Sequence, residues 1–287
     1  MKTILILGAS GLLGKNLTDK LQDSPYTLLT HSRNSDTDYK FDLSNASLVR
    51  NNLNRIKPDI IFNLAANTNV DICEGNKHMA YSDNVTSVQN ISSWLNNSPA
   101  NCRLIHISTD QLYDGRGPHK EIDSKAMNYY AHSKLLSEAP VLNSKGLVLR
   151  TNFFGKSNVK ERLSFSDWIY SALVEKTKIT VFDDIYFSPL SMETLTKLLS
   201  ELVVSDLIGL YNLGSNNGMS KASFAYKFAM YLGMNSSNIS VGSQESSSLL
   251  AYRPKDMRMC CKKFEEDFKL DLPNLEEEIK KVAGEYK

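Results

Sequence analysis

An α/β fold, in which a doubly wound parallel sheet carries helices on both faces, is the fold class that this sequence predicts. Three features indicate it. Short apolar runs alternate with helical patterns through the first half of the chain, several of these runs contain almost no polar residue, and a glycine-rich turn follows the first of them. Strands that are buried on both faces of a parallel sheet need no polar alternation, and strand–helix–strand units connect by right-handed crossovers.

The expected strands are short. They cover residues 3–7, 26–31, 59–64, 102–108 and 146–150, with a further short strand just before Phe41. Leu13, Leu17 and Leu21 recur every four residues and predict the first helix. Further helices are expected over residues 46–56, where Pro58 ends the pattern, and over residues 77–94 and 129–138.

The composition is that of an ordinary globular protein: of 287 residues, 41% are apolar and 23% are charged. The net charge of +1 gives no support to binding of nucleic acid or of an anionic membrane surface. The apolar runs are too short to span a membrane, and no targeting segment is recognised, so we expect a cytoplasmic protein. The four cysteines lack zinc-ligand spacing and are expected to be free thiols.

Three glycines mark the turn between the first strand and the first helix, in the pattern Gly8-x-x-Gly11-x-x-Gly14. A glycine-rich turn lets the backbone approach a pyrophosphate, and the helix N-terminus adds free N–H groups and the positive end of its dipole. In a sheet of this kind such a turn binds a dinucleotide. The turn residues expected to hold the cofactor are Gly8, Ser10, Gly11, Leu12, Leu13 and Gly14.

The glycine spacing differs from the G-x-G-x-x-G form and resembles the extended branch of the short-chain dehydrogenase/reductase superfamily. Phe41-Asp42-Leu43 follows the short third strand, where that family places an Asp beside the adenine. Asn63-Leu64-Ala65-Ala66 ends the next strand, where the family lays small residues under the cofactor. The resemblance implies that the Rossmann-type sheet binds the dinucleotide through further residues, namely Asp42, Leu43, Ala65, Ala66, Asn67, Thr68, Asn84, Tyr130 and Lys134.

A Tyr-x-x-x-Lys pair, Tyr130 and Lys134, carries the chemistry. Residues four apart share one helix face. A tyrosine has a pKa near ~10, and a neighbouring ammonium favours the phenolate and lowers that pKa. Such a tyrosine can pass a proton to a carbonyl oxygen while hydride reaches the carbon. A hydroxyl at the end of the fifth strand, in Ser108-Thr109, can hold that oxygen. The resemblance implies a catalytic set of Thr109, Tyr130 and Lys134, with Lys134 also on the nicotinamide ribose.

Within the superfamily the chain most resembles the dTDP-4-dehydrorhamnose reductase group, through the ordered stretches AANTNVDICE, HISTDQLYDG, NYYAHSKLLSE, RTNFFG, DDIYFSPL and RPKDMRMCCKKF. The resemblance implies NAD(P)H-dependent reduction of a 4-keto group on a nucleotide-linked deoxysugar, as in dTDP-rhamnose and polysaccharide biosynthesis. It implies substrate contacts from Val70, Thr109, Asp110, Phe153 and Arg253.

Four positions depart from the group. Gln111 stands where the group usually has Tyr or a similar residue. Phe153 stands where the group often has Trp beside the sugar, and Phe187 stands where it commonly has Gly, which suggests an altered substrate pocket. Lys15 replaces an acidic residue that some members link to a metal-bridged dimer, so we predict no metal. The sequence says little about the oligomeric state and leaves a homodimer open.

The end of the second strand indicates the cofactor. The sequence has Thr30 and His31 where an acidic residue would bind the ribose hydroxyls and select NAD, and Ser32 and Arg33 follow. A hydroxyl and a guanidinium suit a 2′-phosphate. We therefore predict a preference for NADPH through Ser32 and Arg33, with NADH as an alternative cofactor.

The second half of the chain is less regular. Helical patterns return over residues 192–204 and 220–232 and around Leu275, Ile279 and Val282. We expect a dinucleotide-binding domain over residues 1–151 and a smaller, mainly substrate-binding domain over residues 152–287, with a segment near 187–213 that returns to the first domain's sheet.

Other functions within the superfamily remain open. A nucleotide-sugar 4,6-dehydratase would carry Thr-Asp-Glu where this chain has Thr109-Asp110-Gln111, and glutamine cannot shuttle the proton. A nucleotide-sugar epimerase is less well excluded, and it would keep its cofactor tightly bound. A non-catalytic, dinucleotide-binding regulatory subunit is the alternative outside enzymes, although Thr109, Tyr130 and Lys134 are intact.

Overall fold

The structure is a computed structural model and describes residues 1–98, 101–159, 162–246 and 249–287. Its contacts divide the chain into two compact units. The first unit contains residues 1–109, 128–150 and 196–211, and the second contains residues 110–127, 151–195 and 212–287. The segment 110–127 thus belongs to the second unit, although we expected the first 151 residues to form one domain. The cofactor and substrate roles of the two parts stay predictions.

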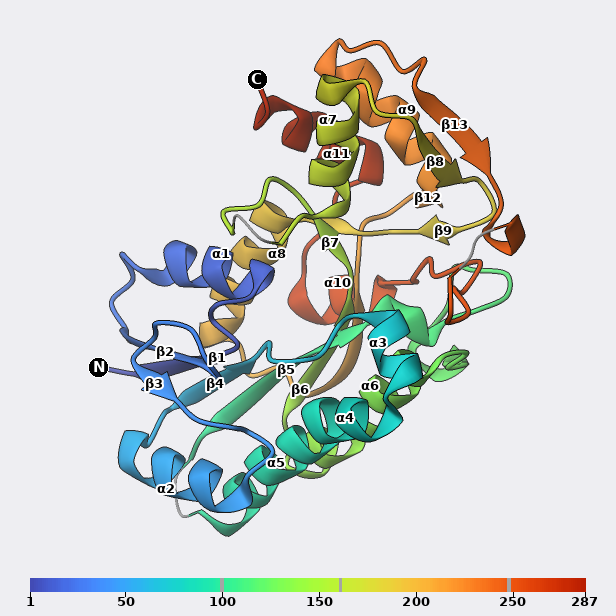
Figure 1. Cartoon of the computed structure of the whole chain (residues 1–287). Helices are drawn as coiled ribbons and strands as arrows, with labels where there is room; N and C mark the ends of the chain where they lie inside the picture. The colour runs from blue at the N-terminus through green and yellow to red at the C-terminus, as the bar shows by residue number, and fades with distance from the viewer. Residues whose placement is uncertain (99–100, 160–161, 247–248) are drawn as a thin grey trace. The chain divides into compact units, whose positions relative to one another are not determined.

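A seven-stranded sheet forms the centre of the first unit, in the order β11-β6-β5-β4-β1-β2-β3 (Figure 1). The pairs β3–β2, β2–β1, β1–β4 and β4–β5 are parallel. The predicted α/β fold with a doubly wound parallel sheet is confirmed. The strands are β1 (Thr3–Leu7), β2 (Thr27–Ser32), β3 (Tyr39–Lys40), β4 (Ile60–Asn63), β5 (Arg103–Thr109), β6 (Leu147–Thr151) and β11 (Gly209–Leu213).

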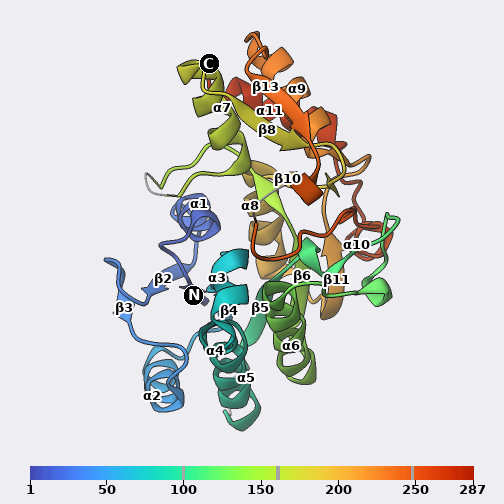
Figure 2. The same ribbon diagram turned by 45° about the vertical axis from the view of Figure 1, so that its right-hand side comes forward.

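Helices lie on both faces of this sheet (Figure 2). One face is covered by α2 (Ala46–Ile56), α5 (Ser87–Asn97) and α6 (Tyr129–Asn143), and α1 (Leu12–Leu21) lies on the other. Alternate residues of a strand point to opposite faces, so Leu5 and Leu7 of β1 join the core beneath α2 and α5. That core also contains Val49, Leu53, Ile61, Val88, Ile91, Trp94, Leu104, Val141 and Val148.

The helical stretch expected over residues 77–94 is confirmed, and it contains an irregular turn. It runs from α4 (Lys77–Tyr81) through a π-helical turn (Ser82–Thr86) into α5. A π-turn accommodates one extra residue and often marks a functional region. Here it contains Asn84, whose side chain is buried. A preceding short helix, α3 (Val70–Gly75), was not predicted.

The second unit is built from short strands and three packed helices. The strands β8 (Ile179–Phe182) and β13 (Ile239–Gly242) pair in parallel. Two smaller pairs are β7 (Phe153–Phe154) with β10 (Leu190–Ser191) and β9 (Tyr186–Phe187) with β12 (Met219–Ser220). The packed helices are α7 (Phe165–Glu175), α9 (Lys221–Leu232) and α11 (Leu275–Gly284). The short α10 (Lys262–Phe268) also belongs to this unit, whereas α8 (Met192–Glu201) begins in it and belongs to the first unit from residue 196 onward.

Several aromatic side chains pack together in the mainly aliphatic core of this second unit. The helix α7, which we did not predict, begins at a capping box made by Ser164 and Asp167. Phe187 is only 3% exposed, and its ring centroid lies 5.8 Å from that of Phe165 and 5.5 Å from that of Phe224. Its side chain therefore packs into the core, and any influence of Phe187 on a ligand would be indirect.

Within the described ranges, no helix combines the length and the apolar character that a membrane crossing requires.

Candidate active site

The turn between β1 and α1 is closely packed against the rest of the first unit. Gly8 has a φ of +85°, which favours glycine, and a Cβ there would lie 2.8 Å from the backbone nitrogen of Ala65. A Cβ at Gly14 would lie 2.2 Å from the carbonyl oxygen of Gly8. These two glycines therefore allow the turn to approach the end of β4 and the helix α1 to pack on the turn.

The N-terminus of α1 is open to a ligand. Its N-cap residue, Gly11, has no side chain to accept a hydrogen bond, and the first turn carries no acidic residue. The first-turn N–H groups of a helix, here from Leu12 and Leu13, have no carbonyl partner within the helix. The positive end of a ten-residue helix therefore faces this turn with its donors available to an anion, which fits the pyrophosphate of a dinucleotide.

The predicted 2′-phosphate residues lie at the end of β2. The Ser32 hydroxyl is buried and bonds within its own turn, donating to the carbonyl of Ser35 at 2.9 Å and accepting from the Ser35 amide. The Arg33 side chain is 57% exposed, and its guanidinium lies 2.9 Å from the carboxylate of Asp83. Arg33 is thus extended into solvent, and one of its N–H groups is already paired.

The residues predicted to lie beside the adenine follow β3. Asp42 accepts a hydrogen bond from the backbone N–H of Ser44, and this bond holds the pKa of the Asp42 carboxyl below its usual value. Leu43 is buried in the core under α2 and α5. The carboxylate of Asp42 therefore stays charged near neutral pH and can accept from a ligand.

The loop after β4 is held by Asn84 of the π-turn. The Asn84 amide accepts from the backbone N–H of Asn67 at 2.7 Å and donates to the Asn67 carbonyl at 3.1 Å. It also donates to the hydroxyl of Ser133 on α6 at 2.9 Å. Asn84, predicted to contact the cofactor, thus uses its side chain to position the loop that contains Ala65, Ala66, Asn67 and Thr68. Val70, predicted to contact the substrate, is 8% exposed at the start of α3.

The three predicted catalytic residues all belong to the first unit. Thr109 ends β5, and Tyr130 and Lys134 lie one turn apart on α6, which packs against β5. All three side chains are buried, with exposed fractions of 5%, 6% and 2%. The Lys134 amine donates to the carbonyl of Ile107 at 2.7 Å, so it reaches β5 two residues before Thr109.

Burial changes the acidity of Lys134. It lowers the pKa of the amine to about 8, and the charge of Glu138, one turn further along α6, opposes that effect. A buried ammonium next to Tyr130 is the feature that would make a phenol more acidic. The site therefore holds a cation whose charge is weakly screened by water.

This buried amine makes stability depend on pH. Lysine titrates at 10.5 when unperturbed and at about 8 here, so between these values the unfolded chain binds more protons and stability rises with pH. The difference amounts to about 3 kcal/mol. We expect the free energy of unfolding of the wild type, measured with urea, to rise by roughly this amount between pH 8 and pH 10.5. This rise is measured as the difference from Lys134→Met, which lacks the titrating amine.

The control for that measurement is Lys20→Met, which removes an exposed lysine from the last turn of α1. Its pH profile should follow that of the wild type. Parallel profiles for the wild type and Lys134→Met would show that Lys134 is not desolvated.

A buried ion pair lies one turn along α6 from Lys134. The Glu138 carboxylate accepts two hydrogen bonds from Arg150 of β6, at 2.9 and 2.7 Å, and one from the hydroxyl of Ser108 of β5 at 2.6 Å. Glu138 and Arg150 are 3% and 2% exposed. These bonds join α6 to two strands of the sheet, one turn beyond Lys134.

The other predicted substrate residues lie in the second unit. Asp110 is buried and accepts from the Asn152 amide at 2.6 Å. Phe153 follows in β7 with a partly exposed side chain. Arg253 donates to the carbonyl of Ala251 at 2.9 Å.

Sequence reasoning missed a lysine, Lys221, whose amine interacts electrostatically with Asp110 and Arg253. Lys221 is the first residue of α9, and its amine lies 5.4 Å from the ring centroid of Phe165. Burial lowers its pKa, the charge of Asp110 raises it, and that of Arg253 lowers it. The sequence signal that could have identified it is its place in the first turn of the helix predicted over residues 220–232, where the helix dipole disfavours a cation.

Sequence reasoning also missed an acidic side chain beside β2. The carboxylate of Asp38, from the residue before β3, accepts from the backbone N–H and the hydroxyl of Thr30 at 2.8 and 2.7 Å. Thr30 lies two positions before the end of β2. The Asp38 carboxylate uses both hydrogen bonds to stabilise this strand.

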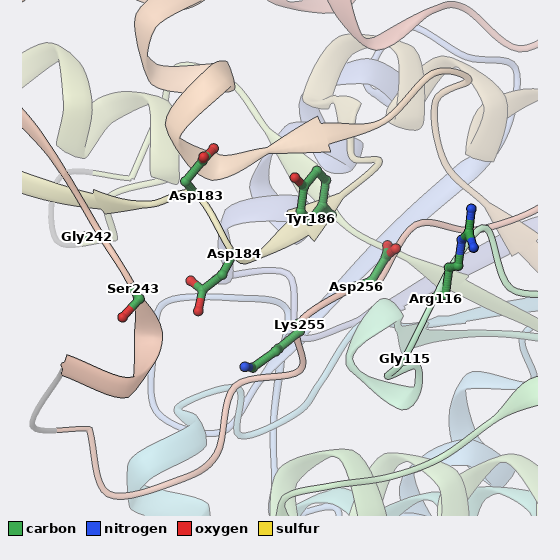
Figure 3. A pocket seen from close by; sticks show the side chains of 9 residues that line it. All are labelled: Gly115, Arg116, Asp183, Asp184, Tyr186, Gly242, Ser243, Lys255 and Asp256. Atoms are coloured by element: carbon green, nitrogen blue, oxygen red, sulfur yellow. The ribbon is translucent and has the colours of Figure 1, made fainter.

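A surface pocket of about 540 Å³ opens in the second unit (Figure 3). Asp184 and Lys255 point toward the same space in it, and Lys255 also lies 2.7 Å from Glu245. The lining carboxylates already have partners: Asp256 pairs with Arg258, Asp183 accepts from the Ser220 hydroxyl, and Asp184 accepts from the backbone N–H of Gln244. The lining residues are Gly115, Arg116, Asp183, Asp184, Tyr186, Gly242, Ser243, Lys255 and Asp256.

Comparison with known proteins places this arrangement in a family. The model of the RmlD substrate binding domain matches residues 1–287. The chain belongs to this family. The predicted resemblance to the extended short-chain reductases of the dTDP-4-dehydrorhamnose reductase group is thereby confirmed.

Relatives within this family align over most of their length. The chain is 29% identical over 302 residues to a dTDP-4-dehydrorhamnose reductase of Escherichia coli K12, with 98% of this chain and 97% of the relative covered. It is 30% identical over 258 residues to one from Sinorhizobium fredii, with 85% and 86% covered. The crystal structure of dTDP-4-dehydrorhamnose reductase from Bacillus anthracis str. Ames in complex with NADP has a TM-score of 0.88, 27% identity, and coverage of 99% of this chain and 100% of that one.

Proposed function

We propose that the protein is an NADPH-dependent reductase of a 4-keto group on a nucleotide-linked deoxysugar, the activity named for its relatives. The observation that carries this proposal is the catalytic face of the first unit. Tyr130 and Lys134 lie on one side of α6. The Lys134 amine donates a hydrogen bond to the carbonyl of Ile107 on β5, two residues before Thr109. A proton donor, a buried cation and a hydroxyl are what carbonyl reduction requires beside a hydride donor.

The glycine turn and the strand ends would hold the dinucleotide. The open N-terminus of α1 suits the pyrophosphate, Asp42 suits the adenine side, and Lys134 suits the nicotinamide ribose. NADPH bound there supplies the hydride. The complete predicted set is Gly8, Ser10, Gly11, Leu12, Leu13, Gly14, Ser32, Arg33, Asp42, Leu43, Ala65, Ala66, Asn67, Thr68, Tyr130 and Lys134, with Asn84 holding the loop.

The chain's own residues deliver the proton. Thr109 orients the carbonyl oxygen by a hydrogen bond, and Tyr130 donates its phenolic proton to that oxygen as the carbon is reduced. The Lys134 ammonium stabilises the phenolate that remains. The ketone thus gains one hydride and one proton and becomes an alcohol.

The second unit would bind the rest of the substrate. Lys221 and Arg253 carry two positive charges that act on one another, and the carboxylate of Asp110 acts on Lys221. Two such cations suit a diphosphate. The partly exposed ring of Phe153 offers an apolar surface to the sugar. Val70 of the first unit stays a predicted contact.

The proposal is tested by a substrate screen. The purified protein is mixed with dTDP-, GDP-, UDP- and CDP-linked 4-keto sugars, and the loss of NADPH absorbance is followed. We expect stoichiometric NADPH consumption with at least one of them. A tightly bound cofactor that is not consumed would indicate an epimerase, and no turnover together with a co-purifying larger partner would indicate a regulatory subunit.

Arg33 should determine the cofactor preference. Arg33→Ala is expected to lower kcat/KM for NADPH about tenfold or more and to change that for NADH little, because only NADPH carries the 2′-phosphate that a guanidinium can bind. Steady-state kinetics with both cofactors measure the ratio.

The matched control is Arg50→Ala, which removes an exposed arginine from α2 and should leave the ratio unchanged. A wild-type preference for NADH, or an unchanged ratio in Arg33→Ala, would remove this role from Arg33. In that case the Arg33–Asp83 pair is simply a surface salt bridge.

A homodimer and a cytoplasmic location are further expectations from the sequence. Size-exclusion chromatography with light scattering and cell fractionation test them.

A further inference from the structure

A buried histidine of the first unit lies beside Lys134. His106 of β5 is 0% exposed, and its Nε2 lies 3.4 Å from the Lys134 amine. Both ring nitrogens have side-chain neighbours: Nδ1 lies 3.1 Å from the Asn63 amide nitrogen, and Nε2 lies 3.1 Å from the Ser137 hydroxyl. Asn63 ends β4 and Ser137 lies on α6, so the ring connects two elements of the site.

The hydrogen bonds around His106 fix its tautomer. The Asn63 side-chain oxygen accepts from the backbone N–H of Ala65 at 3.3 Å, which leaves the Asn63 NH₂ group to donate to His106 Nδ1. The Ser137 hydroxyl donates to the Lys134 carbonyl at 2.7 Å, so its oxygen accepts from His106 Nε2. The proton therefore resides on Nε2.

The ring is also neutral. Burial lowers the pKa of His106 well below its ordinary value, and the charge of Lys134 lowers it further. Glu138, one turn along α6 from Lys134, is paired with Arg150 of β6. A second positive charge 3.4 Å from the ammonium would be strongly repelled.

A neutral ring with its proton on Nε2 cannot accept a hydrogen bond from Lys134. The amine is therefore left with the Ile107 carbonyl as its acceptor on β5, at 2.7 Å, and its other two N–H groups stay available to the site.

We propose that His106 is a positioning residue for Lys134. Its uncharged ring connects the loop after β4, through Asn63, to α6, through Ser137, and packs against the Lys134 amine, which donates to the Ile107 carbonyl. This inference rests on the proposed function for the role of Lys134, but the state of the ring can be measured without turnover.

The first test is nuclear magnetic resonance of the protein with ¹⁵N-labelled histidine. The ring nitrogens of His106, assigned by comparison with His106→Gln, should show a proton on Nε2 alone and no titration between pH 5 and 9. A ring that titrates in this range, or that carries its proton on Nδ1, would overturn the proposal.

The second test uses kinetics. His106→Leu should lower kcat about ten- to a hundredfold per active site, because Lys134 loses its fixed position. His106→Gln keeps an N–H that can reach Ser137 and should recover most of the loss. Affinity for NADPH, measured by fluorescence titration, should fall in His106→Leu and recover in His106→Gln.

The control for these variants is Ser92→Ala on α5, because the Ser92 hydroxyl is buried and makes no hydrogen bond in the described structure. It should change neither rate nor affinity. If His106→Leu keeps wild-type kcat and NADPH affinity, His106 is only a core residue. If the wild type itself turns over no nucleotide sugar, the proposed function fails, while the resonance test still decides the state of the ring.

Discussion

Replacing Tyr130 by phenylalanine should lower the turnover of a 4-keto nucleotide sugar by about a hundredfold or more, the effect of losing a general acid. The substitution removes one hydroxyl from a side chain that is 6% exposed, so packing on α6 should persist. Affinity for NADPH should hardly change, because Lys134 and the glycine turn are intact. Steady-state kinetics and a fluorescence titration with NADPH measure the two quantities.

The neighbouring tyrosine provides a matched control. Tyr129 lies on the same helix but in a different register, and its ring packs near His132 and Lys77. Tyr129→Phe should therefore keep near wild-type turnover. Wild-type turnover in Tyr130→Phe would remove Tyr130 from the chemistry, whereas equal losses in both variants would indicate a general effect on α6.

Replacing Arg150 by methionine should lower the free energy of unfolding by about 3–5 kcal/mol, because it leaves the buried Glu138 carboxylate without its cation. The pair is bidentate, with both side chains almost fully buried. Urea unfolding at pH 7, followed by circular dichroism, measures the change.

Two further variants show whether the loss comes from an unpaired charge. The double variant Arg150→Met with Glu138→Leu should recover much of the stability, because a buried pair replaced by apolar residues is often neutral. Lys15→Met, which breaks the exposed Lys15–Asp19 pair of α1, should cost about 1 kcal/mol or less. A loss of similar size in Arg150→Met and Lys15→Met would contradict the assigned burial.

The sequence predicted the strand and helix order of the first unit closely. The expected helix over residues 46–56 is α2, the expected strand over residues 3–7 is β1, and Tyr130 and Lys134 lie on α6 as their spacing implied. These features follow from local periodicity and from glycine and proline positions, which depend on few distant partners. The family could be recognised for the same reason, because its motifs are short and ordered along the chain.

Three contacts of the site join residues that lie far apart in the sequence. The π-turn around Asn84 meets Asn67 and Ser133, which lie 17 and 49 residues away. Arg33 pairs with Asp83 across 50 residues. No local pattern encodes such pairs, because they form only when the strands and helices pack.

The sequence by itself therefore determined the sheet, the glycine turn and the identity of the catalytic candidates. Each depends on a local pattern of residue types: apolar runs, glycine spacing, and a tyrosine and a lysine four residues apart. Only the tertiary structure decided their chemical state. The depressed pKa of Lys134, the neutral ring of His106 and the pairing of Glu138 with Arg150 all arise where distant segments exclude water. Burial and partner choice set those states, and both depend on packing across the whole unit.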